Sequence, residues 1–299
     1  MAAAQILAGR SIIVTGAGKG IGRAIAVTLA RHGAFVLVNN RGHQGEAQSS
    51  AARVVEEITA AGGTAVANTA SVEQPSAAQA MVTQALTAFG GLDGVIFNAA
   101  IAPQKRIAGT GIDTLKSAFE INYFAPFALT QAALPVMREH GRLLYVISNG
   151  GLYGGDGLGA YAGTKAALYA LMRTAAAEGP HFGITANAIA PFARSQMTQA
   201  HLPPHLAEAL APEWIGPAAA WLMSAECKQN AKIYVTGGGL VREARVVETS
   251  SRRFHHYNAD PGQDIAQLFD DLAALPADRV PESATAAFGD IIKDFQTRC

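Results

Sequence analysis

The stretch that decides the fold is Ser11-Ile-Ile-Val-Thr-Gly-Ala-Gly-Lys-Gly-Ile-Gly22. Its apolar, β-branched start predicts a buried strand over residues 11–15, and the spacing that follows predicts a helix over residues 21–32. The glycines between them allow a tight turn and a close approach of the backbone to a ligand. The N–H groups and positive dipole end of such a helix bind a pyrophosphate. A glycine turn without a ligand is the alternative, which the strand–turn–helix context disfavours.

The same alternation of short apolar runs and helical patterns continues beyond this stretch. We expect strands over residues 35–38, 64–67, 94–97, 143–147, 185–189 and 233–235. Helical spacing lies between them, over residues 47–61, 76–89, 115–138 and 160–178. This order predicts an α/β protein: a Rossmann-type, doubly wound parallel sheet with helices on both faces. We assign this Rossmann-type domain to residues 1–240, including a substrate lid around residues 192–214. We expect a C-terminal helical extension over residues 241–299, packed on this domain or on a partner subunit.

The composition excludes several classes of function. The 299 residues carry 23 Lys and Arg against 23 Asp and Glu, so the chain lacks the positive field that nucleic acid or an anionic membrane attracts. Its two cysteines exclude a disulfide framework, and no ligand cluster has the spacing of a metal site. A secretory signal and a membrane-spanning run are both lacking. We therefore expect a cytoplasmic protein with no metal, nucleic-acid or membrane partner.

Two of the predicted helices point to self-association. Residues 115–138 and 160–178 are apolar on almost every side, and such a helix must be buried on every side. The sheet covers one side, so a partner subunit is the simplest cover for the other, and we expect a homodimer or homotetramer. A thicker monomer core is the alternative.

Landmarks recur at one family's spacing over residues 7–239. The glycine stretch reads Thr-Gly-x-x-x-Gly-x-Gly, and Asn-Ala-Ala at 98–100 follows the fourth expected strand. Further on come an isolated Asn, a Ser and a Tyr-x-x-x-Lys pair, which are Asn122, Ser148, Tyr161 and Lys165. This set resembles the short-chain dehydrogenase/reductase family. The resemblance implies hydride transfer between a nicotinamide cofactor and a substrate, with those four residues as the catalytic set.

Several segments resemble one branch of that family more closely. They include Ser71-Val-Glu73, Ser195-Gln-Met-Thr198 and Pro212-Glu-Trp-Ile-Gly-Pro217. They are similar to the (3R)-hydroxyacyl-CoA dehydrogenase domain found in peroxisomal multifunctional enzymes of type 2. This implies a 3-hydroxyacyl or 3-oxoacyl thioester as substrate. The 299 residues contain no hydratase or lipid-carrier domain, which leaves the substrate open.

The residue types of the catalytic set suit acid–base chemistry. Tyr161 and Lys165 are four residues apart, which places them on one helix face. A nearby ammonium favours the phenolate and lowers the pKa of a tyrosine, which is otherwise near 10. Ser148 follows a strand, where its hydroxyl can bond a substrate carbonyl or alkoxide. The resemblance further implies that Asn122 supports a proton relay through water to Lys165.

The end of the second strand bears on the cofactor. An acidic residue there binds the ribose 2′-OH of NAD and repels a 2′-phosphate, but the chain reads Asn39-Asn-Arg41. Arg41 and Lys19 are cations that can reach a 2′-phosphate, so NADP(H) is favoured, with acceptance of NAD(H) through Asn40 as the alternative. The remaining cofactor contacts are implied by the resemblance. They are Gly16, Gly18, Gly20, Ile21, Ser71, Val72, Asn98, Ala99, Ala100, Tyr161, Lys165, Pro191, Ala193 and Ser195.

The expected substrate side is apolar. Besides Ser148, its candidate residues are Leu152, Tyr153, Phe192 and Met197, which suggest a hydrophobic ketone or secondary alcohol, although ordinary lid packing explains them equally well. The cations Lys105, Arg106 and Arg194 are weak evidence for an acyl-CoA phosphate. The sequence thus predicts an NADP(H)-dependent oxidoreductase that interconverts a ketone and a secondary alcohol, with Tyr161 as general acid/base. The alternatives are an NAD-dependent 3-hydroxyacyl-CoA or hydroxysteroid dehydrogenase, and a non-catalytic NADP(H)-sensing protein.

Overall fold

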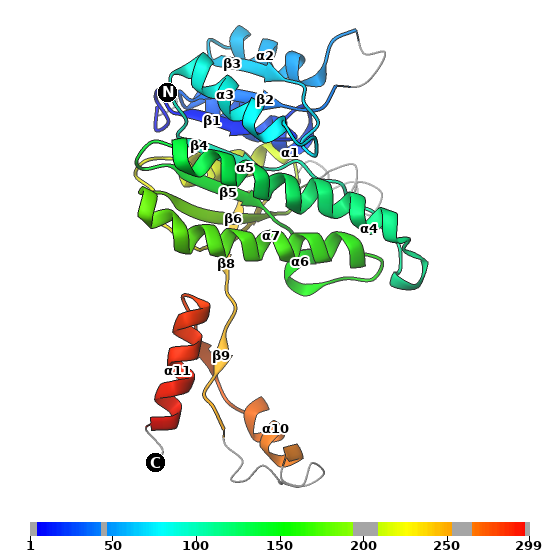
Figure 1. Ribbon diagram of the computed structural model, residues 1–299, viewed down its shortest axis with the longest axis vertical. Coiled ribbons are helices and arrows are strands. Elements are labelled where there is room, and N and C mark those ends of the chain that lie inside the picture. The colour runs from blue at the N-terminus through cyan, green and yellow to red at the C-terminus, as the bar shows by residue number, and fades with distance from the viewer. Residues whose placement is uncertain (1–4, 43–46, 194–208, 253–264, 297–299) are drawn as a thin grey trace. The chain divides into compact units, whose positions relative to one another are not determined.

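The computed structural model describes residues 5–42, 47–193, 209–252 and 265–296. An eight-stranded sheet in the order β3-β2-β1-β4-β5-β6-β7-β8 forms its centre (Figure 1). The strands are β1 (Ser11–Val14), β2 (Phe35–Asn39), β3 (Thr64–Asn68), β4 (Gly94–Phe97), β5 (Arg142–Val146), β6 (Thr185–Pro191), β7 (Ile233–Gly237) and β8 (Leu240–Ala244). β1 to β7 pair in parallel, which confirms the predicted doubly wound sheet.

Helices cover both faces of this sheet. α1 (Gly20–Arg31), α2 (Ser50–Ala60) and α9 (Gly216–Leu222) lie on one face. α3 (Ala77–Phe89), α5 (Ala125–Ala133) and α7 (Gly159–Glu178) lie on the other, which faces the viewer in Figure 1. Ile25 and Leu29, one turn apart on α1, are fully buried in the same apolar cluster as Val36 and Val38 of β2. At roughly 2 kcal/mol for each such side chain, this packing fixes α1 and its N-terminus against the sheet.

The strand order reverses beside β1. β1 pairs with β2 on one side and with β4 on the other, and the chain reaches β4 only after β3 and α3. A sheet of this topology binds its ligands outside the carboxyl ends of the strands at this switch point. The glycine stretch follows β1 there, as the sequence predicts.

The helix expected over residues 115–138 is wrong as a single element. It consists of α4 (Ile112–Phe119), a π-helical turn η2 (Glu120–Phe124), α5 and a 3₁₀ turn η3 (Leu134–Val136). Pro126 explains why the helical hydrogen-bond pattern changes near Asn122, because proline has no N–H to donate to the carbonyl four residues before it. Pro135 likewise falls where the last α-helical turn ends.

An eighth strand is present that the sequence reading missed. Gly238 and Gly239 have φ of +58° and +77°, the left-handed pair of a two-residue hairpin, so β8 returns along β7 as an antiparallel edge strand. β8 reads Leu-Val-Arg-Glu-Ala and is mostly exposed, so it lacks the continuous apolar run that marks the buried strands.

The chain divides into two compact units, Met1–Glu243 and Ala244–Cys299. In the second unit, β9 (Glu248–Thr249) pairs antiparallel with β10 (Ala277–Arg279), and the helices are α10 (Ala266–Ala273) and α11 (Ala284–Gln296). Arg279 binds both carboxylate oxygens of Asp294, at 2.9 and 3.1 Å, which ties β10 to α11. The assignment of residues 241–299 to a packed helical extension stays a prediction.

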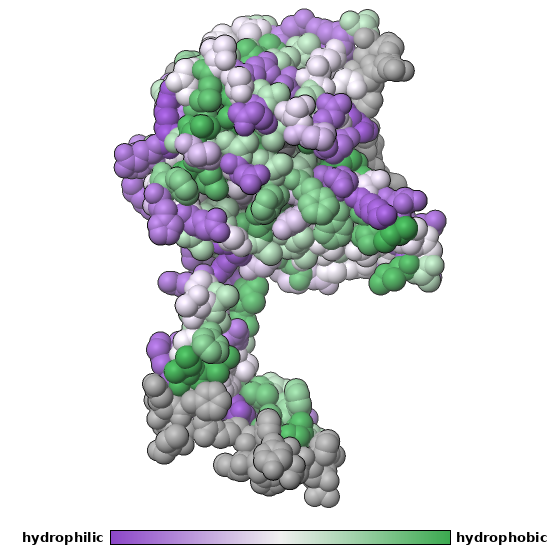
Figure 2. Space-filling model, in the orientation of Figure 1, coloured by the Kyte–Doolittle hydropathy of each residue, from purple (hydrophilic) through white to green (hydrophobic). Residues whose placement is uncertain are grey.

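An exposed aromatic surface lies on α4, η2 and α5. The rings of Phe119, Tyr123, Phe124 and Phe127 contact one another at centroid distances of 5.6–6.3 Å. Phe124 and Phe127 are nevertheless 50% and 48% exposed. Figure 2 shows hydrophobic side chains gathered on the face that these helices and α7 cover. None of the described helices is long and apolar enough to cross a membrane.

A buried charge cluster secures the amino ends of the strands. The Asp93 carboxylate accepts from the Ser11 N–H at 2.8 Å and from the Arg138 guanidinium at 2.9 Å. Arg10 donates to the carbonyls of Asp93 and His140. Because these groups bridge the starts of β1, β4 and β5, they brace the edge opposite the switch point.

Candidate active site

The glycine loop after β1 is packed so closely that side chains do not fit in it. Gly16 and Gly20 have φ of +64° and +56°, which other residues rarely adopt. A Cβ on Gly18 would meet Ser50 Oγ and the Asn40 side chain, and one on Gly22 would meet the Gly16 carbonyl. The Lys19 side chain makes no capping bond to the first turn of α1. The loop therefore forms a close backbone cradle at an α-helix N-terminus, the arrangement that a pyrophosphate needs.

Thr15 and Asn98 join the two strand ends at the switch point. Thr15 Oγ1 accepts from the N–H groups of Asn98 and Ala99, at 3.0 and 3.1 Å. Asn98 Nδ2 donates to the carbonyls of Thr15 and Gly16, both at 3.0 Å. These four bonds fix the segment at residues 98–100 against the glycine loop. Both segments of the predicted cofactor site are thus brought together.

The end of β2 carries polar groups without an acidic one. Asn40 Nδ2 donates to Ser50 Oγ at 2.7 Å, and Arg41 beside it is exposed. Asn39, which the sequence reading did not select, is buried and donates to Asn68 Oδ1 at 2.8 Å and to the Ala70 carbonyl at 2.9 Å. It therefore orders the turn that leads to Ser71 and Val72. Its signal was an uncharged amide at the carboxyl end of a largely buried strand.

Ser148, Tyr161 and Lys165 lie at the carboxyl end of β5. Ser148 is the N-cap of α6 (Asn149–Tyr153), where its Oγ accepts from the Gly150 N–H at 3.1 Å. Tyr161 and Lys165 stand one turn apart on α7, and both are buried. Lys165 Nζ donates to the Val146 carbonyl at 2.7 Å and lies 5.9 Å from the centre of the Tyr161 ring. The three predicted residues form one group.

Burial dominates the electrostatics of this group. It raises the pKa of Tyr161, and a hydrogen bond with Ser148 opposes that rise. Burial also lowers the pKa of Lys165 to about 8. The lysine was expected to lower the pKa of the tyrosine. Burial instead raises it, because burial penalises the charged phenolate, and the opposing contribution comes from Ser148.

Asn122 is buried in the π-helical turn, and its side chain is fully engaged. Its Oδ1 accepts from the Ile101 N–H at 2.9 Å, and its Nδ2 donates to the Ile101 carbonyl at 2.8 Å and to Thr164 Oγ1 at 2.9 Å. Thr164 Oγ1 in turn donates to the Tyr161 carbonyl at 2.7 Å. Thr164, also missed from the sequence, therefore links Asn122 to the helix that bears Tyr161. The group that Asn122 can offer to a proton relay is therefore its backbone carbonyl. This carbonyl has no α-helical hydrogen-bond donor, because the residue four positions later, Pro126, has no N–H.

The residues expected around a substrate are only partly described. Tyr153 and Phe192 are 75% and 42% exposed at the ends of α6 and β6, and Leu152 is half-buried. Pro191 ends β6, and Ala193 is buried. Ser195, Met197 and Arg194 lie outside the described residues, as does most of the lid expected at 192–214.

Two loops are joined beside the expected substrate side. The N–H of Lys105 donates to the Gly157 carbonyl at 2.7 Å, and Arg106 pairs with Asp156 at 3.2 Å. Arg106 therefore has an exposed carboxylate partner, which weakens its case as a phosphate ligand. No group of three or more His, Cys, Asp or Glu suited to a metal ion occurs among the residues that the structure describes.

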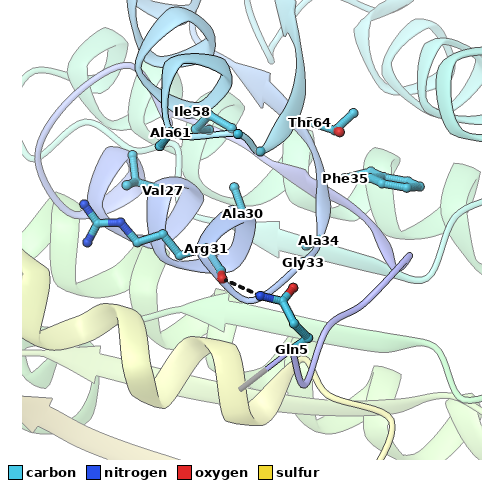
Figure 3. Close-up of a pocket in the computed structure, with 12 residues that line it drawn as sticks. Gln5, Val27, Ala30, Arg31, Gly33, Ala34, Phe35, Ile58, Ala61 and Thr64 are labelled. Carbon is cyan, nitrogen blue, oxygen red and sulfur yellow. Dashed lines mark hydrogen bonds between the residues drawn. The ribbon is translucent and has the colours of Figure 1, made fainter. Parts of the chain in front are cut away.

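A surface cavity of about 250 Å³ lies away from this group (Figure 3). It is bounded by the C-terminal ends of α1 and α2 and by the starts of β2 and β3, and Gln5 closes one side by donating to the Arg31 carbonyl at 3.3 Å. That is the amino edge of the sheet. The cavity contains none of the predicted site residues.

A close-packed glycine loop at the switch point and a buried tyrosine–lysine pair at the same edge are features of a Rossmann-type oxidoreductase. The chain belongs to the short chain dehydrogenase family, whose family model matches residues 10–204. Members of this family use NAD or NADP, and the family resemblance drawn from the sequence is confirmed.

Individual relatives agree with this assignment. A Mycobacterium tuberculosis protein named as a short-chain type dehydrogenase/reductase is 36% identical, over 91% of this chain and 96% of its own length. Mouse peroxisomal multifunctional enzyme type 2 is 37% identical over 79% of this chain, which spans 33% of that enzyme. The crystal structure of a short chain dehydrogenase from Mycobacterium avium superposes with a TM-score of 0.82 at 34% identity, over 92% of this chain and 99% of that one. The closer resemblance to the multifunctional enzymes is thereby supported.

Proposed function

We propose that the protein is an NADP(H)-dependent oxidoreductase that interconverts a ketone and a secondary alcohol, with Tyr161 as general acid/base. The observation that carries this proposal is the buried group of Ser148, Tyr161 and Lys165 at the edge where the glycine cradle opens. A tyrosine kept protonated by burial suits the donation of a proton to a carbonyl oxygen, and its hydrogen bond with Ser148 supports a shared role for the two hydroxyls.

The residues at the strand ends fit the cofactor. The glycine loop would hold the pyrophosphate at the N-terminus of α1. A Cβ at Gly18 or Gly22 would meet neighbouring protein atoms, so only glycine allows this close packing of the loop. Ser71 and Val72 would border the adenine, and Asn98 to Ala100 the ribose. Pro191, Ala193 and Ser195 would lie on the nicotinamide side. When bound, the nicotinamide supplies or accepts the hydride.

The chain's own groups manage the proton. In the direction of reduction, Tyr161 Oη gives its proton to the carbonyl oxygen while Ser148 Oγ donates a hydrogen bond to the same oxygen, where negative charge develops. The Lys165 ammonium stabilises the phenolate that remains. With a pKa lowered to about 8, Lys165 itself exchanges protons readily near neutral pH. The backbone carbonyl of Asn122 would hold the water that returns the proton.

Charge at the end of β2 supports NADP(H). Asn40 puts no carboxylate beside the site, and exposed Arg41 supplies a cation that suits a 2′-phosphate. Lys19 adds a second cation from the glycine loop. Acceptance of NAD(H) through Asn40 is the competing outcome.

The substrate is proposed to be a hydrophobic ketone or alcohol, or a 3-hydroxyacyl or 3-oxoacyl thioester. Exposed Tyr153 and Phe192 support an apolar body. The exposed aromatic surface of Phe124 and Phe127 supports a homodimer or homotetramer, since apolar patches of this kind mark contacts between subunits. A cytoplasmic location stays a prediction.

The test is oxidation of NADPH by the purified protein with 3-oxoacyl-CoA thioesters and with free aromatic, alicyclic and steroid ketones. NADH is run in parallel. Tyr161→Phe is expected to bind NADPH normally and to lose at least ~10³-fold in kcat. Normal NADPH binding without turnover of any ketone or alcohol by the native protein would favour the NADP(H)-sensing alternative. Equal turnover by Tyr161→Phe would refute the role of the tyrosine.

A further inference from the structure

Arg242 is a cation that the catalytic group does not use. It is the third residue of β8, and its guanidinium lies over the ring of Phe192, 5.7 Å from the ring centre. Phe192 follows β6, and its N–H donates to the Thr236 carbonyl of β7 at 2.7 Å. The absence of a side chain at Gly237 allows this approach, since a Cβ there would meet the Phe192 carbonyl. The aromatic ring therefore holds the guanidinium at a defined place.

That place is at the edge of the sheet where the catalytic group lies. The Ile147 N–H, next to Ser148, donates to the Ile189 carbonyl at 2.8 Å, and Phe192 lies three residues beyond Ile189. Neighbouring strands are about 4.8 Å apart, so Phe192 and Ser148 extend from adjacent strand ends. Arg242 stands on the edge strand β8, two strands beyond β6 on the side away from β5.

The guanidinium has no carboxylate partner among the residues that the structure describes. Glu243 beside it pairs with Lys232 at 3.4 Å, and Glu213 pairs with Arg23 at 3.5 Å. Residues 194–208, which continue from Phe192, contain one acidic residue, Glu208. An arginine that is fixed on a ring, with no carboxylate partner in the described parts of the chain, suits a ligand anion, because its planar fork matches a carboxylate or a phosphate.

The surroundings of Arg242 are apolar. Phe192 is 42% exposed, Leu240, on the same face of β8 as Arg242, is 77% exposed, and the ring of Trp214 lies against Gly239 at the hairpin. We infer that Arg242 is an anion-binding residue of the substrate site, and that the substrate combines an apolar body with a carboxylate or phosphate at its outer end. This inference rests on the proposed function, and it narrows the substrate class of that function.

The experiment compares Arg242→Ala with Lys228→Ala. The control also removes an exposed cation, but one that lies before the amino end of β7, away from the site. Three ketones are tested: acetoacetyl-CoA, which carries phosphates; 4-acetylbenzoate, which carries a carboxylate; and neutral methyl 4-acetylbenzoate. Arg242→Ala is expected to raise KM about tenfold for whichever anionic ketone is the better substrate. KM for the ester, and the Kd of NADPH, should stay within twofold of the native values.

The pattern of losses identifies the anion. A loss confined to acetoacetyl-CoA assigns the contact to phosphate, and a loss confined to 4-acetylbenzoate assigns it to carboxylate. Arg242→Lys should keep part of the effect, since it retains the charge and loses the planar fork. An equal change for the neutral ester, or the same change in Lys228→Ala, would overturn the inference.

A second measurement separates this inference from the proposed function. If the native protein reduces none of the three ketones, the proposed activity on them fails, and Arg242 is then tested by binding. Calorimetry of coenzyme A and of 4-acetylbenzoate with the NADP⁺-loaded protein should give a Kd that rises about tenfold in Arg242→Ala. Equal affinity in the two proteins, or no binding of either anion by the native protein, would refute the role of Arg242.

Discussion

The substitution Asn40→Asp tests the proposed cofactor preference. Asn40 donates to Ser50 Oγ at 2.7 Å, and a carboxylate of the same shape can accept from that hydroxyl, so the fold of the loop should be kept. The variant places a negative charge where the glycine loop packs closely against residue 40. The substitution therefore changes one charge among the groups that we expect to select the cofactor, and little else.

The expected magnitude follows from Coulomb's law. For unit charges about 6 Å apart, repulsion amounts to about 0.7 kcal/mol in bulk water and to about 2.8 kcal/mol at the effective dielectric constant of a protein surface. Asn40 is half-buried, so the penalty lies between these limits for each phosphate charge. The kcat/KM for NADPH should therefore fall about 3- to 100-fold for each phosphate charge. That for NADH should stay the same or rise.

Steady-state kinetics with both cofactors at a fixed ketone concentration measures this effect. Arg41→Ala is the companion variant and should weaken NADPH alone, by about tenfold. Arg53→Ala removes an exposed cation further along α2 and serves as the control. Asn40→Asp should also lose less NADPH affinity at high salt, because added ions screen the repulsion. A parallel fall for NADH, or no fall for NADPH, would refute the argument that charge at this strand end selects NADP(H).

Three further predictions concern the framework around the site. Thr164→Val removes one hydrogen bond to the Asn122 amide, worth about 1 kcal/mol. We expect kcat to fall about fivefold, with an altered pH profile and an unchanged KM. Thr164→Ser should restore kcat. Lys165 has a pKa of about 8 in the folded protein and an ordinary value of 10.5, so the unfolded chain binds more protons between these two pH values. The free energy of unfolding, measured by urea denaturation, should therefore rise with pH over that range. The rise should be absent in Lys165→Met. Asp93→Asn breaks the buried cluster, so Tm should fall by roughly 10 °C in calorimetry, while a change within 2 °C would contradict the bracing role.

The sequence predicts the parallel sheet well because its central strands contain short apolar runs. β1, β4 and β5 are buried along their whole lengths, and glycines or helical patterns bound them. β8 escapes the same reasoning because an exposed edge strand need not be apolar. The available signal was the Gly238-Gly239 pair, which is typical of a two-residue hairpin.

The break of the predicted helix at residues 120–124 shows a second limit. An α-helix and a π-helical turn repeat apolar residues at similar spacing, so periodicity runs through both. Pro126 and Pro135 were the available warnings. Tyr161 and Lys165 could be grouped from their four-residue spacing, and Ser148 joined them through the family resemblance. Asn39 and Thr164 could not, because their importance arises from hydrogen bonds between segments far apart in the chain.

The short strand β8 also limits how copies of the protein can meet. A sheet that ends in a long, flat, apolar edge invites another chain to add its own strand. Here the edge is five residues long, and Arg242 and Glu243 place opposite charges on it. Growth of one continuous sheet from copy to copy is therefore disfavoured at this end. We therefore expect copies of the chain to associate through their helices rather than through this edge, and we expect the charges on β8 to oppose fibrous aggregation.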